Sequence, residues 1–146
     1  MSELRGPHAS TGYWLKLSAQ SYQRELDAAL RPLKLTTPQF SVLAGANWLA
    51  QQRPGPTQQR IADFAGADRM MTSKILKTLE ARKLIRRSTS ASDARARVIE
   101  LTESGRALVT RAIALARDVD RRLFGSDTEL RRSLIEHFGK DHHVPS

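Results

Sequence analysis

Residues 57–83, TQQRIADFAGADRMMTSKILKTLEARK, constrain the fold most, because they contain two short helical patterns on either side of a glycine-containing turn. Thr57 can cap a helix that ends at Gly66, and Asp68 can cap a second helix. Apolar residues at helical spacing predict the contact between them: Ile61, Phe64 and Ala65 against Met71, Ile75 and Leu79. Two short helices joined in this way are typical of a helix-turn-helix unit.

The flanking segments extend this unit into a larger, mainly α fold. Before it, the sequence predicts a helix over about 12–30 that Pro32 ends, and a second helix capped by Thr36 or Thr37. After it, LIRRSTS and ARARVIEL predict a two-stranded hairpin. Thr102 can cap a long helix, and Ser126 or Asp127 a last short one. A helix-turn-helix followed by such a hairpin predicts a winged helix-turn-helix lobe with a two-stranded β wing.

The charge of the chain favours a polyanionic partner. The formal net charge is +9, and residues 82–97 carry six basic residues and one acid, Asp93. Such an excess on one short projection is costly to hold together without a polyanion nearby. The alternative is that the arginines are ordinary surface residues of a basic proteome. We expect double-stranded DNA as the partner, and Asp93 as a residue that holds the loop of the hairpin.

Two groups of side chains are candidates for DNA contact. On the second helix of the unit, residues that lie away from the predicted buried stripe can donate hydrogen bonds to phosphates or guanine edges: Arg69, Ser73, Lys74 and Lys77. On the hairpin, we expect Arg95 to enter the minor groove, where arginine is favoured, with Arg87 and Arg97 as phosphate or structural partners. A solvated helix face is the alternative for the first group.

At this point the sequence resembles the multiple-antibiotic-resistance regulator (MarR) family of bacterial transcription factors. The most specific piece is DARARVIELTESGRAL, which matches the wing pattern of the family. TQQRIADFAGADR and SKILKTLEARKLIRR match the two halves of its reading unit, and LRPLKLTTPQFSVL matches the segment joining the first two helices. The resemblance covers nearly the whole chain.

Two departures from the family pattern affect the reading helix. Lys83 stands where the family usually ends this helix with glycine, so we expect the exit from the helix to differ locally. Met70 and Met71 stand where members often carry Ser or Thr, which removes two polar candidates for base contact.

The resemblance implies a homodimeric repressor with one MarR-type domain, residues 1–146. Residues of about 1–35 and 102–146 would form the dimerisation lobe, and about 36–101 the winged helix-turn-helix lobe. Many apolar residues on the terminal helices of a short chain support the dimer independently. Such a dimer would bind a pseudo-palindrome with half-sites about 10 bp apart.

The resemblance also implies release from DNA by a small aromatic or phenolic ligand, bound between the two lobes. Four aromatic residues are candidates for its pocket: Tyr13, Trp14, Phe40 and Trp48. The alternative is that they are core aromatics, since apolar residues at helical spacing usually are.

Other classes of function find less support in the sequence. There is no cysteine and no phosphate-cradling glycine loop, so we expect no enzyme, no cofactor and a cytoplasmic location. No apolar run approaches the ~20 residues that span a bilayer, so we expect no membrane partner. A metal-responsive regulator is an alternative, although we expect no metal site. It rests on acids and histidines that cluster near the C-terminus: Glu136, His137, Asp141, His142 and His143. A sequence-neutral DNA-packaging protein is the other alternative.

Overall fold

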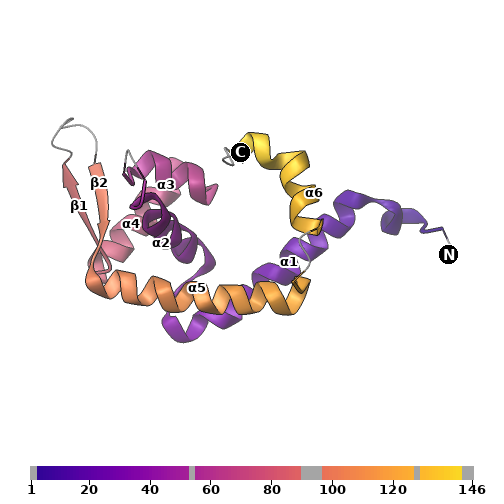
Figure 1. The fold of residues 1–146 in the computed structure, drawn as a ribbon, viewed down its shortest axis with the longest axis horizontal. Coiled ribbons are helices and arrows are strands. Elements are labelled where there is room, and N and C mark those ends of the chain that lie inside the picture. The colour runs from indigo at the N-terminus through magenta and orange to yellow at the C-terminus, as the bar shows by residue number, and fades with distance from the viewer. Residues whose placement is uncertain (1–2, 53–54, 90–96, 127–128, 143–146) are drawn as a thin grey trace.

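The computed structural model describes residues 3–52, 55–89, 97–126 and 129–142, and is mostly helical (Figure 1). Its α-helices are α1 (Thr11–Leu30), α2 (Thr37–Leu49), α3 (Gln58–Ala65), α4 (Arg69–Ala81), α5 (Glu103–Phe124) and α6 (Glu129–Phe138). Strands β1 (Ile85–Thr89) and β2 (Arg97–Leu101) form the sheet, and short 3-10 helices lie at Gly6–Ala9, Arg31–Leu33 and Gly139–His142. The winged helix-turn-helix that the sequence predicts is confirmed.

Side-chain caps at the helix starts explain why the elements begin where they do. Thr36 and Gln39 form a reciprocal capping box at the start of α2. The side chains of Thr57, Asp68 and Thr102 accept hydrogen bonds from backbone N–H groups in the first turns of α3, α4 and α5. Each cap satisfies a donor that has no partner within the helix, so these polar residues fix the boundaries.

The helix-turn-helix packs on α2 and on the base of the wing. Gly66 ends α3 with φ of +65°, a left-handed conformation that glycine adopts without a Cβ penalty. The core is formed by buried apolar side chains from α1 to α5 and the strands, among them Leu43, Ile61, Leu76 and Ile99. Burial of each such side chain contributes on the order of 2 kcal/mol, which holds α4 firmly against the rest of the lobe.

Two of the predicted contacts across the turn are wrong. Met71 is 48% exposed, and Thr72 is fully buried in its place, beside Leu76 on the inner face of α4. The polar Thr72 tolerates burial because its hydroxyl donates a hydrogen bond to the Asp68 carbonyl at 2.8 Å. Phe64 is 51% exposed and lies against α2, where its ring closely approaches Gly45.

The wing is an antiparallel hairpin in which Ile85 pairs with Leu101 and Arg87 with Ile99. Residues 85, 99 and 101 are buried, so one face of the ribbon belongs to the core. The Ile99 N–H also donates to the Pro56 carbonyl at 2.9 Å, which attaches β2 to the segment before α3. The base of the wing is therefore fixed relative to the helix-turn-helix.

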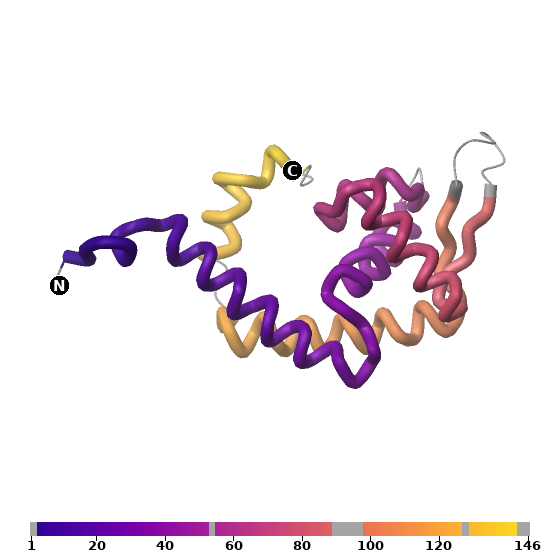
Figure 2. Tube along the Cα trace, turned by 180° about the vertical axis from the view of Figure 1, so that it is seen from behind, coloured from indigo at the N-terminus to yellow at the C-terminus, as the bar shows by residue number. Residues whose placement is uncertain are grey.

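The long helices α1 and α5 lie side by side and carry the winged lobe at one end (Figures 1 and 2). The N-terminal part of α1 and the whole of α6 lie at the other end, away from the wing. None of the helices in the described part of the chain is both long and apolar enough to cross a membrane.

Candidate nucleic-acid interface

The outer face of α4 presents a row of cations. Arg69, Lys74 and Lys77 are exposed, and Ser73 is half-buried. The opposite face packs on α2, α3 and β1, which leaves this row free on the surface of the winged lobe. A helix of this kind fits the major groove of a duplex, where lysine and arginine can reach phosphates and guanine edges.

The centre of this face is an apolar residue that sequence reasoning assigned no role. Met70 is 80% exposed, more than any other large apolar side chain in the described residues. Lys74 follows it by one turn and Lys77 by two, so these three side chains share the side opposite Thr72 and Leu76. The spacing of residues along the helix could have placed Met70 on the outer face. The sequence instead predicts Met71 on the buried face, because methionine is apolar and threonine is not.

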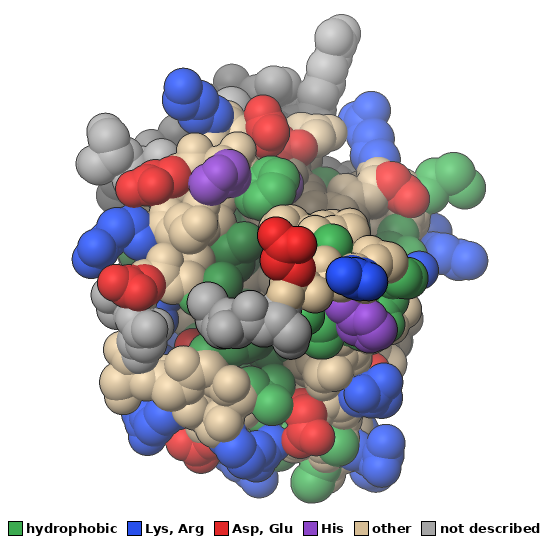
Figure 3. Space-filling view, turned by 90° about the vertical axis from the view of Figure 1, so that its right-hand side faces the viewer, with side chains coloured by type: hydrophobic (Ala, Val, Ile, Leu, Met, Phe, Trp, Pro, Cys, Tyr) green, Lys and Arg blue, Asp and Glu red, His purple; other side chains and the backbone are tan. Residues whose placement is uncertain are grey.

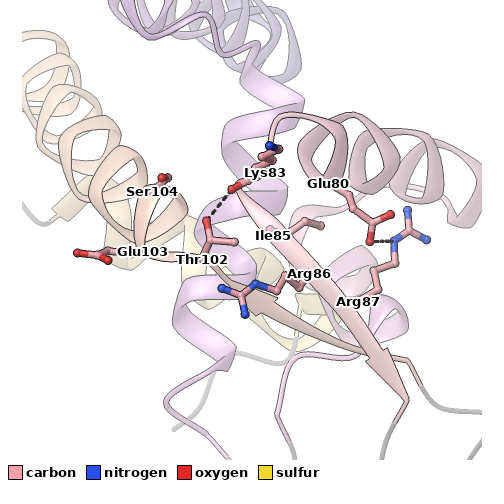
Figure 4. Close-up of a pocket in the computed structure, with 8 residues that line it drawn as sticks. All are labelled: Glu80, Lys83, Ile85, Arg86, Arg87, Thr102, Glu103 and Ser104. Carbon is pink, nitrogen blue, oxygen red and sulfur yellow. Dashed lines mark hydrogen bonds and ion pairs between the residues drawn. The ribbon is translucent and has the colours of Figure 1, made fainter.

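Arg87 on β1 serves as a structural partner of α4. Its side chain is only 9% exposed, its Nη2 donates to the Ser73 carbonyl at 3.4 Å, and its Nε lies 3.8 Å from Oε2 of Glu80 (Figure 4). The Nε atom is buried and has no hydrogen-bond partner within the described residues, so the contact with Glu80 is an ion pair only. Of the two roles predicted for Arg87, the geometry favours the structural one.

Arg82 is a second arginine of the basic segment, residues 82–97, that makes hydrogen bonds within the protein. Its guanidinium donates to the carbonyls of Lys34 at 2.8 Å and Leu33 at 3.4 Å, which ties the end of α4 to the segment before α2. Lys83 and Arg86 are exposed. The charge of residues 82–97 is therefore not all available to a polyanion.

The remaining predicted wing contacts are not placed by the structure. Arg95 and Asp93 lie outside the described residues. Arg97 begins β2, where only its backbone is described. Their roles stay predictions.

The exit from α4 places Lys83 in a left-handed backbone conformation. Lys83 has φ of +60°, which is the left-handed conformation that glycine would adopt. Its carbonyl accepts a hydrogen bond from the Thr102 hydroxyl at 2.7 Å (Figure 4). The lysine therefore takes the strained conformation that glycine would adopt, at a cost of about 1 kcal/mol. The expected local difference from other members of the family stays a prediction.

An open depression of about 660 Å³ lies where α4, β1 and α5 meet, and is lined by charged residues including Arg86 and Glu103 (Figure 4). At its edge the first turn of α5 lies against the backbone of residue 84. A Cβ placed on Gly105 would lie 2.0 Å from the Leu84 carbonyl oxygen, so only glycine fits there. This contact brings the start of α5 directly against the backbone that leads into β1.

Comparisons with known proteins agree with this arrangement. The MarR family model matches residues 35–96, which span the segment before α2, the helix-turn-helix and much of the wing. The HTH-type transcriptional repressor Rv2887 of Mycobacterium tuberculosis is 33% identical over 138 residues, covering 91% of this chain and 96% of the relative. The chain belongs to the MarR family.

Solved structures of the family share the fold. CouR from Rhodococcus jostii, bound to p-coumaroyl-CoA, superposes with a TM-score of 0.81 over 98% of both chains, at 24% identity. The M. tuberculosis regulator MosR, solved in complex with DNA, is 30% identical, with a TM-score of 0.70 over 92% of this chain and 96% of the other. The resemblance to MarR regulators inferred from the sequence is confirmed.

In this MarR-family chain a second surface feature lies on the terminal helices. A groove of about 590 Å³ runs between α1, the end of α5 and α6, lined mainly by apolar side chains. Apolar side chains gather around a hollow at this end of the molecule, among charged ones (Figure 3). Several lining residues are large and exposed: Trp14, Leu15, Leu130, Leu134 and Phe138. Although α6 is described in full, none of its residues is buried.

Polar groups occur at one side of this groove. Burial raises the pKa of the Tyr22 phenol above its ordinary value, and the nearby Asp120 carboxylate raises that pKa further. Asp120 also lies 3.9 Å from the Arg131 guanidinium, which joins α5 to α6.

The four aromatic residues predicted to line a ligand pocket do not meet around one cavity of the single chain. Trp14 lines the groove of the terminal helices, and its indole N–H donates to the His8 carbonyl at 2.9 Å. Tyr13 contacts the rings of His8 and Trp14 edge to face, near the N-terminus. Phe40 and Trp48 lie on α2 in the winged lobe, where Phe40 packs against the core and Trp48 is half exposed.

Proposed function

We propose that the chain is a homodimeric transcriptional repressor that binds a pseudo-palindromic operator. The observation that carries the proposal is the row of exposed cations on α4, presented beside a wing by a rigid winged helix-turn-helix. The α4 helix of each subunit enters the major groove through Arg69, Lys74 and Lys77, and the wing lies along the flanking backbone. The repressor Rv2887 and the DNA complex of MosR support this assignment.

The terminal helices supply the dimer. The large exposed apolar side chains of α1, α5 and α6 would stay in water in a single chain, at a cost of about 25 cal/mol per Å² of apolar surface. A second copy that covers the groove between these helices removes that surface from water. The two α4 helices of such a dimer are related by a two-fold axis, which is the symmetry of a palindromic duplex.

Selection of duplexes from a random pool by the purified chain tests the DNA function. We expect one enriched sequence with two half-sites about 10 bp apart and a single footprint over both. Arg95→Ala then weakens binding strongly and lowers the dependence of log affinity on log salt by about one unit per subunit. Uniform binding without enrichment would instead support the packaging protein.

Release by a small aromatic ligand stays a prediction. Such a ligand acts only if it binds the DNA-competent and DNA-incompetent forms with different affinity. A panel of phenolic acids, each added to the protein–operator complex, tests it through the change in operator affinity.

The metal-responsive alternative has its own test. In the part of the chain that the structure describes, no group of three or more His, Asp or Glu side chains is placed to hold a metal ion. His143 lies outside that part. Loss of operator binding on adding a chelator would favour this alternative.

A further inference from the structure

Met70 is an apolar side chain at the centre of a cationic face. It is the second residue of α4, it is 80% exposed, and its neighbours on the same side are Lys74 and Lys77. The cations of this face suit phosphates, but a thioether side chain gains nothing from a phosphate. Its exposure therefore needs a different explanation from that of the lysines around it.

The major groove offers one apolar group to such a side chain. Among the base edges exposed there, only thymine carries a methyl group, at C5. Residues at the N-terminal end of a reading helix are those that contact base edges. Methionine is unbranched and polarisable, so it adapts its shape to a small apolar group.

We propose that Met70 contacts a thymine methyl group in each operator half-site, and so makes an A·T pair at that position a determinant of specificity. The inference rests on the DNA-binding function proposed above and deepens it. Lys74 and Lys77 anchor the helix along the groove, and Met70, between them and the cap at Asp68, reads the base.

Neighbouring residues do not compete for this role. Met71 is 48% exposed, lies a quarter turn away towards the edge of the face, and its backbone N–H is held by the Asp68 carboxylate at 2.7 Å. Thr72 is buried and donates its hydroxyl to the Asp68 carbonyl. Only Met70 has an apolar side chain centred on the outer face of this turn.

Uracil substitution isolates the methyl group. Deoxyuridine pairs like thymidine and lacks only the C5 methyl, so a duplex with one thymine replaced differs by a single contact. We measure the affinity of the full-length dimer for the selected operator and for duplexes with deoxyuridine at each thymine in turn. One position per half-site should weaken binding by about fourfold, the effect of losing one buried methyl-sized group.

Three variants assign that effect to a residue. Met70→Ala should remove the difference between the thymine and uracil duplexes, and Met70→Leu should retain it. Lys77→Ala should weaken binding to both duplexes equally, because it removes a charge and leaves the methyl contact in place. Because the side chains of Met70 and Lys77 are both exposed, circular dichroism melting should show the same fold in every variant.

The outcomes separate this inference from the function on which it rests. A wild-type chain that binds every uracil duplex as tightly as the parent would overturn the role of Met70, although the repressor function would stand. A Met70→Ala variant that retains the fourfold difference would also overturn it. If no sequence is enriched in the selection, the proposed function fails, and this inference fails with it.

Discussion

Replacing Gly105 with alanine tests the junction between the wing and α5. The added methyl group would lie 2.0 Å from the Leu84 carbonyl oxygen, which belongs to the backbone and has no flexible side chain to move aside. The start of α5 must therefore shift away from the wing. That shift strains two hydrogen bonds of Thr102, from its N–H to Leu84 at 3.0 Å and from its hydroxyl to Lys83 at 2.7 Å.

The size of the stability loss follows from two destabilising effects and one stabilising effect. Overpacking against fixed neighbours costs about 1–3 kcal/mol. Weakening two hydrogen bonds adds about 1 kcal/mol each if both are lost. The higher helix propensity of alanine returns at most about 1 kcal/mol. We therefore expect Gly105→Ala to lower the free energy of unfolding by about 2–4 kcal/mol.

Urea unfolding followed by circular dichroism measures this change, at one fixed protein concentration because dimerisation is linked to folding. Gly12→Ala is the matched control, since Gly12 also lies in the first turn of a long helix but its added methyl meets only the Ser10 hydroxyl oxygen at 3.7 Å. The control should be neutral or stabilising by up to about 1 kcal/mol. If Gly105→Ala unfolds like the wild type, the contact with Leu84 does not constrain the wing as described.

Three further predictions concern single side chains. Lys83→Gly should raise the free energy of unfolding by about 0.5–1 kcal/mol, because glycine adopts the observed φ of +60° without strain; a decrease in a urea titration would contradict this. Arg87→Ala should lower stability by about 1–3 kcal/mol and leave the salt dependence of DNA binding unchanged. Lys77→Ala should leave stability unchanged and reduce the salt dependence of DNA binding. Thermal melting measures the first quantity and anisotropy titrations at several salt concentrations measure the second. The raised pKa of Tyr22 means that the fold favours the protonated phenol, so its contribution to stability is complete below pH 10 and is lost as the pH rises through the folded pKa. Tyr22→Phe should therefore lose less stability than the wild type over that pH range. Asp120→Asn should lower the pKa of Tyr22, which an absorbance titration measures.

Helix boundaries were predictable because polar caps act locally. Thr57, Asp68 and Thr102 each accept a backbone hydrogen bond within their own helix, and nothing distant competes with them. Gly66 ends α3 for the same local reason. The wing was predictable because two β-leaning segments separated by a short polar loop have few alternatives to pairing with each other.

The phase of α4 was less predictable because it depends on how polar groups are satisfied inside the fold. Thr72 is buried because its hydroxyl finds the Asp68 carbonyl, which hydrophobicity alone does not indicate. Met70 and Met71 are exposed although both are apolar, so the hydrophobicity of single residues did not predict which side of α4 is buried.

The roles of the arginines depended on three-dimensional contacts that no spacing encodes. Arg82 reaches carbonyls nearly fifty residues earlier in the chain, and Arg87 pairs with Glu80 on α4. The sequence alone shows Arg82 only as part of the basic excess, and leaves two roles open for Arg87, as a phosphate partner or a structural one. The likeness of the wing segment to MarR proteins identified the fold correctly, but the partners of these two arginines are visible only in the folded chain.

The spacing of the two half-sites tests the central claim most directly. If two α4 helices of one dimer read one face of a duplex, inserting about 5 bp between the half-sites of the selected operator moves them to opposite faces. Titrations by fluorescence anisotropy should then show a loss of specific affinity of about a hundredfold or more, towards the non-specific level. Insertion of a full turn of DNA should not restore the parent affinity either, because a rigid dimer cannot span the longer distance. Equal affinity for the parent and the 5-bp insertion would contradict the dimeric reading of a palindrome.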